Sequence, residues 1–290
     1  MTRKALAIDI GGTKIYHTII DENGKILGEI KKYSTPKDLT ELENLITGII
    51  SKNEDDADMI AIATAGAVNN ENSKVISSTA NLVEGYNRLN FQSLSKKKVF
   101  IENDANAAAW AEYILGASKN CPSSIILTLG TGVGGGIILN NKLYKGKSGG
   151  AGEMHFKMYS DKRRKCTCGA WDCFEAYASG TGLKLTAEEL LNDKNVTTYD
   201  VINGVKDGCD NMKQVFDVWQ GHILAGLIGL ANLFDPDCFV LSGSMAEFAD
   251  TEFLEKGVNA EIVTAPVKIY KATTGNHAGM IGAALLALKS

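Results

Sequence analysis

The chain has 290 residues, of which 44% are hydrophobic and 22% charged, a composition typical of a globular protein with a sizeable core. Its net charge of −4 and pI near 5.7 lack the basic excess that nucleic-acid binding requires. No apolar stretch approaches the roughly 20 residues of a membrane span. Six cysteines without a signal-peptide pattern do not indicate a disulfide scaffold. We therefore expect a cytoplasmic protein with neither nucleic-acid nor membrane partners.

The N-terminal segment predicts a strand meander followed by a helix. Residues 4–33 contain three β-prone runs, the first two joined by a Gly-Gly turn. The turn Asp21-Glu-Asn-Gly24 is expected to join the second run to the third. Leucine and isoleucine residues at helical spacing then predict a helix near 38–52.

Strands and helices alternate in the next segment. We expect strands at Met59–Thr64 and Val99–Glu102. Asn103-Asp104 then opens an Ala-rich helix that ends at Gly116. Three strands followed by alternating helix and strand are the signature of the α/β ribonuclease-H-like fold.

The opening pattern repeats after residue 120, which predicts two lobes of an actin-like ATPase fold with a cleft between them. We place residues 1–117, with a C-terminal helix at about 279–290, in the N-terminal lobe, and residues 118–278 in the C-terminal lobe. Within that second lobe, Thr186–Gln214 is expected to be helical and peripheral to the sheet. A buried helix at Val218–Leu233 and a strand at Cys238–Leu241 complete it.

The repeated feature is a Gly/Thr turn between two β-prone runs. The first copy is Leu6-Ala-Ile-Asp-Ile-Gly-Gly-Thr-Lys-Ile-Tyr-His-Thr-Ile-Ile20, and the second is Ile125-Ile-Leu-Thr-Leu-Gly-Thr-Gly-Val-Gly-Gly-Gly-Ile-Ile-Leu139. Glycine allows backbone N–H groups to approach a phosphate closely. Two ordinary hairpins would also explain such turns. Two copies in register, the first with Asp9 before its glycines, favour a clamp for the phosphates of a nucleotide.

Asp104 is the candidate catalytic residue. It follows a strand, where α/β sheets bind ligands, and it could act as general base toward an attacking hydroxyl. Spacing alone equally allows a helix N-cap. The presence of the glycine clamp favours catalysis.

A metal site is predicted after the second glycine turn. Cys166, Cys168 and Cys173 lie within eight residues, and His155 lies eleven residues before the first of them. These four side chains match a structural Cys₃His zinc site, with unligated reduced thiols as the alternative. All four positions would be filled by protein, so the Zn²⁺ would be structural.

These motifs together resemble the ROK family of sugar kinases and repressors over nearly the whole chain. The resemblance rests on five segments in order: Asp9-Ile-Gly-Gly-Thr-Lys14, Glu102-Asn-Asp-Ala-Asn-Ala-Ala-Ala-Trp-Ala-Glu112, Gly130-Thr-Gly-Val-Gly-Gly-Gly136, Cys166-Thr-Cys-Gly-Ala-Trp-Asp-Cys-Phe-Glu175, and Asn232-Leu-Phe-Asp-Pro-Asp237 before Leu241-Ser-Gly-Ser244. The Ala-Ala-Ala-Trp-Ala-Glu stretch is similar to N-acetylmannosamine kinases, although glucokinases of the family share much of it.

The resemblance implies a role for each matched residue. Asp104 would be the base, and Asp9 would lie near the Mg²⁺-bound phosphates. The matched positions of the phosphate loops are Gly11, Gly12, Thr13, Lys14, Gly130, Thr131 and Gly132. Gly243 and Ser244 would lie beside the adenosine. The positions that would bind the sugar, besides Asp104, are Asn81, Asn103, Glu153, His155 and Glu175.

The segment around His155 departs from the family pattern. The family has Gly-Glu-x-Gly-His, whereas this chain has Gly-Glu-Met-His-Phe, with His155 two residues after Glu153. A one-residue deletion followed by a one-residue insertion accounts for the change. The identity of the sugar therefore cannot be transferred from the family.

The sequence as a whole predicts an ATP-dependent hexose or N-acetylhexosamine kinase of the glucokinase type, with N-acetylmannosamine kinase as the alternative. We also expect a homodimer. A sugar-responsive repressor is disfavoured because Asp9 lies too near the start to leave room for a DNA-binding domain. The presence of both Asp9 and Asp104 disfavours a non-catalytic sugar-binding module. The Cys₃His segment disfavours an actin-like or chaperone ATPase.

Overall fold

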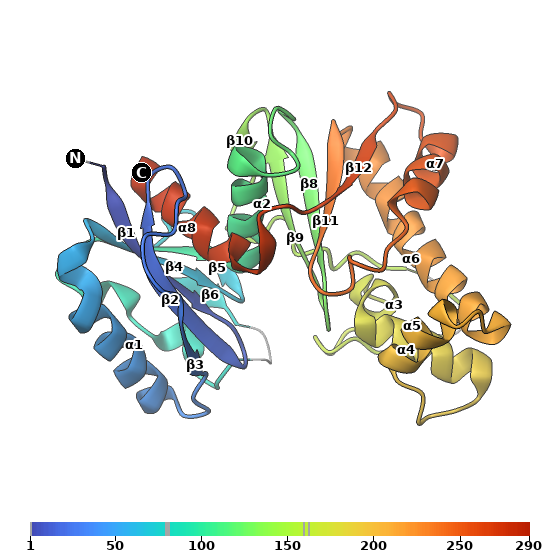
Figure 1. Ribbon diagram of the computed structural model, residues 1–290, viewed down its shortest axis with the longest axis horizontal. Coiled ribbons are helices and arrows are strands. Elements are labelled where there is room, and N and C mark those ends of the chain that lie inside the picture. Colours follow the sequence, from blue (N-terminus) through green and yellow to red (C-terminus); the bar gives the residue numbers. More distant parts are fainter. Residues whose placement is uncertain (1, 79–81, 159, 162) are drawn as a thin grey trace. The chain divides into compact units, whose positions relative to one another are not determined.

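The computed structural model, shown in Figure 1, describes residues 2–78, 82–158, 160–161 and 163–290. The chain divides into two compact units. The first comprises Met1–Pro122, Gly136–Gly152 and Thr273–Ser290, and the second comprises Ser123–Gly135 and Glu153–Ala272. Among the helices built from described residues, none is both long and apolar enough to span a bilayer.

The first unit is built on a five-stranded sheet of order β3-β2-β1-β4-β7. Its strands are β1 (Lys4–Ile10), β2 (Lys14–Asp21), β3 (Lys31–Ser34), β4 (Met59–Thr64) and β7 (Val99–Asn103). β2 pairs antiparallel with β1 and β3, whereas β1, β4 and β7 run parallel. The carboxyl ends of these three parallel strands therefore meet at one edge of the sheet. β5 (Ala67–Val68) and β6 (Val75–Ser77) form a short hairpin after β4.

Alternating side chains give the sheet two different faces. On one face, Leu6 and Ile8 of β1 pack with Ile46 of α1 (Leu39–Asn53). On the other face, the alanines of β1 and β4 pack against α2 (Asp104–Leu115) and α8 (Ala278–Lys289). Because small residues line this second face, the two helices approach each other and the sheet closely. A Cβ at Gly282 of α8 would overlap the carbonyl oxygen of Ala107 of α2.

The third strand begins later than the sequence predicts. Asp21 accepts hydrogen bonds from the backbone N–H groups of Asn23 and Lys25 (both 2.9 Å), so the expected turn is present. After it, Ile26 makes only an isolated bridge to Ile20, and β3 starts at Lys31. Short 3₁₀ helices complete the unit: η1 (Glu54–Asp56), η2 (Tyr86–Arg88), η3 (Phe91–Leu94) and η4 (Gly275–His277).

The second sheet has the order β10-β9-β8-β11-β12. Its strands are β8 (Ser124–Leu129), β9 (Val133–Leu139), β10 (Lys142–Leu143), β11 (Cys238–Ser242) and β12 (Lys268–Lys271), and the division between the units falls within β9. β11 pairs parallel with β8 and β12. The helices of the second unit are α3 (Glu175–Ala178), α4 (Gly180–Leu191), α5 (Thr198–Lys206), α6 (Asp210–Phe234) and α7 (Thr251–Glu261).

The helix predicted at 218–233 is longer and less buried than expected. α6 begins at Asp210, so it includes the end of the stretch that was expected to be peripheral. Trp219 and Leu227 are fully buried, but Val218 is 38% exposed and Leu233 is 77% exposed. The prediction of a buried helix was therefore wrong for one side of α6.

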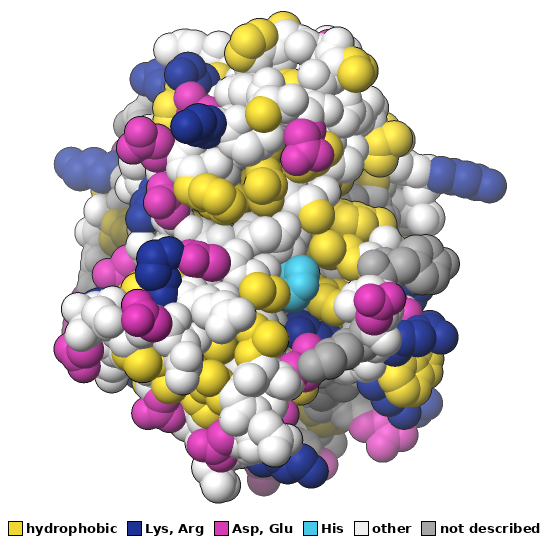
Figure 2. Space-filling view, turned by 90° about the vertical axis from the view of Figure 1, so that its right-hand side faces the viewer, with side chains coloured by type: hydrophobic (Ala, Val, Ile, Leu, Met, Phe, Trp, Pro, Cys, Tyr) yellow, Lys and Arg dark blue, Asp and Glu magenta, His cyan; other side chains and the backbone are white. Residues whose placement is uncertain are grey.

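On the face shown in Figure 2, hydrophobic side chains are interspersed with side chains of both charges.

Candidate active site

The first glycine turn joins β1 to β2 in the first unit. Gly11 N–H donates to the Lys14 carbonyl (3.0 Å), and the Gly11 carbonyl accepts from the Thr35 hydroxyl (2.7 Å). The Thr35 backbone N–H in turn donates to the Thr13 carbonyl (3.1 Å). The segment after β3 therefore fixes the turn through its carbonyl oxygens, while Thr13 and Lys14 remain exposed.

The second glycine turn joins β8 to β9 and contacts the start of α4. The Gly130 carbonyl accepts from Gly180 N–H (2.8 Å), and the Thr131 carbonyl accepts from the Thr181 hydroxyl (2.8 Å). Ser179 caps α4 by accepting from Gly182 N–H (3.0 Å). The helix N-terminus beside this turn favours negative charge. The Ser179-Gly-Thr-Gly182 segment is the sequence signal for this contact, which the motifs above do not include.

The turn after β11 lies beside the second glycine turn. Gly243 has φ +89°, and a Cβ there would overlap the carbonyl oxygen of Leu129, the residue before Gly130. Met245 N–H donates to the same carbonyl (2.9 Å). The structure therefore places Gly243 and Ser244 next to the Gly130 turn, within the second unit.

Asp9 and Asp104 interact electrostatically at the sheet edge of the first unit. Asp9 is the sixth residue of β1, and Asp104 follows β7 directly. Burial, and to a smaller extent the negative charge of Asp104, raise the pKa of Asp9 from 3.8 to about 7. Two carboxylates that repel each other in this way favour binding of a proton or a cation.

Asn103, rather than Asp104, is the N-cap of α2. The Asn103 side chain accepts from Asn106 N–H (2.9 Å) and donates to the Gly66 carbonyl (3.0 Å). Asp104 is the first residue within the helix, and its carboxylate accepts from Ala105 N–H (2.8 Å). The N-cap interpretation of Asp104 was therefore wrong. Its carboxylate sits at a helix N-terminus, where the helix dipole stabilises negative charge.

Three of the predicted sugar-binding residues come together in the second unit. Burial raises the pKa of Glu153, the electrostatic interaction with His155 lowers it, and the interaction with Glu175 raises it. These three side chains are thus close enough to interact. The Glu175 carboxylate also accepts from Val133 N–H (3.1 Å) and from the Thr167 hydroxyl (2.7 Å). Glu175 therefore contacts the second glycine turn, a contact that sequence spacing did not predict.

Asn81 lies outside the described residues.

Met154, between Glu153 and His155, is buried and has φ +50°. This left-handed conformation is uncommon for a residue with a Cβ. It buries Met154 and leaves His155 exposed at the point where the sequence departs from the family pattern.

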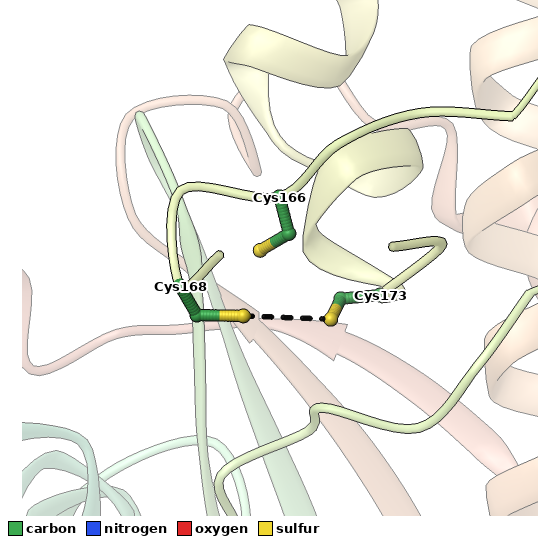
Figure 3. Close-up of side chains that lie close together, drawn as sticks. All are labelled: Cys166, Cys168 and Cys173. Atoms are coloured by element: carbon green, nitrogen blue, oxygen red, sulfur yellow. Dashed lines mark hydrogen bonds between the residues drawn. The ribbon is translucent and has the colours of Figure 1, made fainter. Parts of the chain in front are cut away.

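Three thiols converge in the loop before α3. Figure 3 shows Cys166, Cys168 and Cys173, whose sulfur atoms all lie within 4.8 Å of one another. Cys168 Sγ lies 3.6 Å from Cys173 Sγ. Soft thiolate donors at this separation fit the ligand preference of zinc. His155 is not part of this group, so the structure brings together three of the four predicted ligands.

The thiol loop is also held by buried polar contacts. The carboxylate of Asp172 accepts from Arg164 N–H (3.1 Å) and from the Tyr177 hydroxyl (3.1 Å). The Arg164 guanidinium donates to Glu189 of α4 and to the carbonyl of Ala176. These bonds connect the loop to α3 and α4.

Comparison with known proteins identifies the family of this chain. The model of the ROK family matches residues 5–290. The chain is 34% identical to a glucokinase of Streptomyces coelicolor over 97% of this chain and 96% of that protein. It is 31% identical to an N-acetylmannosamine kinase of Yersinia pseudotuberculosis over 99% of both chains.

A solved structure extends the similarity to three dimensions. It is the crystal structure of a ROK family glucokinase from Streptomyces griseus in complex with glucose and AMPPNP, with a TM-score of 0.80, 29% identity and full coverage of both chains. The predicted α/β fold of the actin-like ATPase type is confirmed. The chain belongs to the ROK family.

Proposed function

We propose that this protein is an ATP-dependent sugar kinase that phosphorylates a hydroxyl group of a hexose or an N-acetylhexosamine. The observation that carries this proposal is the position of two acids at one edge of the first sheet: Asp9 lies before the first glycine turn, and Asp104 lies at the start of α2. Asp9 is near the carboxyl end of β1, and Asp104 directly follows β7, so both lie at the edge where parallel sheets bind ligands. The relatives named glucokinase and N-acetylmannosamine kinase, each matched over nearly its full length, support the same activity.

Asp104 would be the general base. Its carboxylate would orient the acceptor hydroxyl of the sugar and take its proton as the γ-phosphoryl group is transferred. Phosphoryl transfer depends mainly on positioning and on neutralising charge. The capping of α2 by Asn103 supports this role, because the capping function does not occupy Asp104.

The nucleotide would be bound by the two glycine turns and by Gly243-Ser244. Hydrogen bonds from Thr35 fix the first turn, and hydrogen bonds from the start of α4 fix the second. Mg²⁺ would neutralise charge on the phosphates, and Asp9 would help to hold its water shell, because it supplies a carboxylate near the end of the strand that leads into the first glycine turn.

Zinc would have a structural role. The three thiols supply soft ligands, and we propose that His155 completes the site when the metal binds. The Cys166 loop precedes Glu175, which contacts the second glycine turn through Val133. A bound metal would therefore stabilise a segment that carries a proposed sugar ligand.

The experiment that tests the activity is a coupled ADP-release assay with five sugars: glucose, mannose, fructose, N-acetylglucosamine and N-acetylmannosamine. We expect ADP formation that depends on one or two of these sugars and on Mg²⁺. N-acetylmannosamine is included because of the relative with 31% identity. ADP release that no sugar stimulates would contradict the proposal.

A further inference from the structure

Glu102 is a buried acid immediately before the proposed sugar-binding residue Asn103 and the proposed base Asp104. Its side chain is 1% exposed. One carboxylate oxygen accepts from Asn103 N–H (2.9 Å) and from the Asn106 side chain (3.2 Å). The other accepts from the Asn72 side chain (2.7 Å). Only a side chain with two acceptor oxygens can accept all of these bonds. In a glutamine at this position, the amide NH₂ group would face hydrogen-bond donors.

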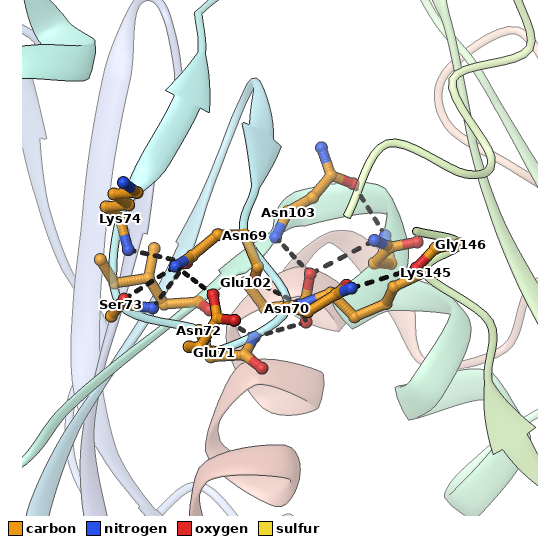
Figure 4. Close-up of polar contacts among 12 residues, drawn as sticks. Asn69, Asn70, Glu71, Asn72, Ser73, Lys74, Glu102, Asn103, Lys145 and Gly146 are labelled. Carbon is orange, nitrogen blue, oxygen red and sulfur yellow. Dashed lines mark hydrogen bonds and ion pairs between the residues drawn. The ribbon is translucent and has the colours of Figure 1, made fainter. Parts of the chain in front are cut away.

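Lys145 supplies the countercharge. Its ammonium group lies 2.9 Å from the Glu102 carboxylate, and its side chain is 12% exposed. The same ammonium donates to the carbonyl of Asn69 (3.1 Å). Figure 4 shows Lys145 reaching Glu102 from a different segment of the chain than Asn103.

The segment that carries Lys145 is held against the loop between β5 and β6. The Asn70 side chain donates to the carbonyls of Gly146 (3.1 Å) and Lys147 (2.9 Å). Gly149 has φ +92°, and a Cβ there would overlap the carbonyl of Val68. This segment continues directly into Glu153, another of the proposed sugar-binding residues. The Glu102–Lys145 pair therefore connects Asn103-Asp104 with the chain that leads to Glu153.

Stability alone does not explain a charge pair at this position. A buried ion pair contributes little net stability compared with apolar side chains of similar size, but removing one partner leaves an uncompensated buried charge. The directed bonds of this pair do fix the geometry of the backbone around Asn103.

We propose that Glu102 and Lys145 form a positioning pair that holds the sugar-binding side of the site, a role that rests on the proposed kinase function. The pair does not touch the reacting atoms. It fixes the start of α2 and the Lys145–Gly152 segment, whereas the contacts of the two glycine turns described above do not involve it. Loss of the pair should therefore weaken sugar binding and slow phosphoryl transfer, but it should leave nucleotide binding unchanged.

The test compares wild type with Glu102→Gln, Lys145→Met and the double variant, using the sugar that the panel identifies. Each single variant should lose about 10–100-fold in kcat/KM for the sugar, because small displacements of a catalytic group are costly. AMPPNP affinity, measured by calorimetry, should stay within about 2-fold of wild type. The double variant should be less impaired than the sum of the single effects, since neither charge remains uncompensated.

Lys268→Met is the matched control. Lys268 makes an ion pair with Glu255 at 2.7 Å, but its side chain is 63% exposed. This variant should keep wild-type kinetics. If Lys145→Met fails to fold, Lys145→Arg replaces it, because the larger guanidinium keeps the charge and alters the geometry. The same selective loss is then expected.

Equal losses in sugar and AMPPNP binding, additive single effects, or wild-type kinetics in all variants would each overturn the positioning role. These outcomes require an active wild-type enzyme. A wild type that phosphorylates none of the five sugars would instead refute the proposed function, so the two failures are distinguishable.

Discussion

At the residue scale, the structure separates the helix cap from the proposed base. Asn103 caps α2, and Asp104 occupies the next position. Sequence spacing could not distinguish the two because Asn and Asp are both favoured N-caps. Only the observed bond from Asn106 N–H to Asn103 assigns the cap.

Asp104→Asn should keep the fold and lose about 10²–10⁴-fold in turnover, the usual loss when a general base is removed. Urea unfolding should give nearly the wild-type free energy, because the cap at Asn103 is intact. Asn103→Ala should instead lose about 1 kcal/mol of stability through loss of that cap. If Asp104→Asn retained turnover within a few-fold of wild type, Asp104 would not be the base.

Asp9 should make stability depend on pH. Burial raises its pKa from the ordinary 3.8 to about 7, so between these pH values the folded protein holds a proton that the unfolded chain has released. This contribution is fully present below about pH 4 and is lost as pH rises through 7. Asp9→Asn stays neutral and should not lose it.

Urea unfolding without Mg²⁺ at pH 5 and pH 8 measures this effect. The stability of Asp9→Asn relative to wild type should be about 2–3 kcal/mol greater at pH 8 than at pH 5, since two pK units correspond to about 1.4 kcal/mol each. If Asp9→Asn and wild type differed in stability by the same amount at both pH values, burial would not raise the pKa of Asp9.

At the scale of elements, regular periodicity predicted the positions of strands and helices well. Contacts between segments far apart in the sequence could not be predicted. The strand at Met59–Thr64 was predicted with its observed ends, and the helices near 38–52 and from 279 begin within one residue of prediction. Local patterns suffice there because β4 is an uninterrupted apolar run buried along its whole length, α8 is apolar and buried on most sides, and α1 buries one regular stripe. The pattern failed for α6, where Ile223 and Leu227 form a buried stripe but the intervening apolar residues include exposed ones.

In the candidate site too, contacts within one short segment could be predicted, whereas contacts between distant segments could not. The convergence of three thiols could be predicted because they lie within one short loop. The partner of Glu102 could not, because Lys145 lies in a separate segment 43 residues further along the chain. The sequence places Glu102 at the end of a strand and at the start of a family segment, but it does not indicate a partner for its side chain.

The contact between α2 and α8 should depend on a single glycine. Gly282→Ala places a Cβ against the carbonyl of Ala107, in a core lined by alanines on both helices and the sheet. We expect a loss of about 1–3 kcal/mol or more from overpacking, measured by urea unfolding. Gly221→Ala in α6 is the matched control, because a Cβ there meets nothing within 4 Å. This control should gain about 0.5–1 kcal/mol from helix propensity, and equal effects of both substitutions would contradict the proposed close packing.

The thiol loop should bind one zinc per chain. Cys168→Ser should lower both the zinc content, measured by elemental analysis, and the melting temperature, because metal binding and local folding are coupled. Cys209→Ser replaces another exposed cysteine outside the group and should change neither. A fully active, thermally unchanged enzyme without zinc would show that the thiols remain unligated and that Arg164 and Asp172 suffice to hold the loop.

At the scale of the whole molecule, the chain re-enters the first unit at Thr273, and the segment from there to Ser290 supplies α8 to its core. Glu112, the buried last residue of the Ala-rich motif, secures this return. Its carboxylate accepts from the backbone N–H groups of Thr273 (2.9 Å) and Thr274 (2.7 Å), and also from Ala117 N–H (2.7 Å). One side chain therefore ties the end of α2 to the start of the C-terminal segment.

Glu112→Gln should weaken this attachment, because the amide nitrogen would face backbone donors. Leaving buried donors without an acceptor costs about 1–3 kcal/mol, which urea unfolding should detect. Limited proteolysis should also cut earlier near residues 272–275, since the segment would detach before the rest of the unit unfolds. Glu29→Gln, at an exposed position of the same unit, is the control and should match wild type in both assays. If Glu112→Gln lost stability but showed no earlier cleavage in this segment, Glu112 would support the core of α2 generally rather than hold the return of the chain.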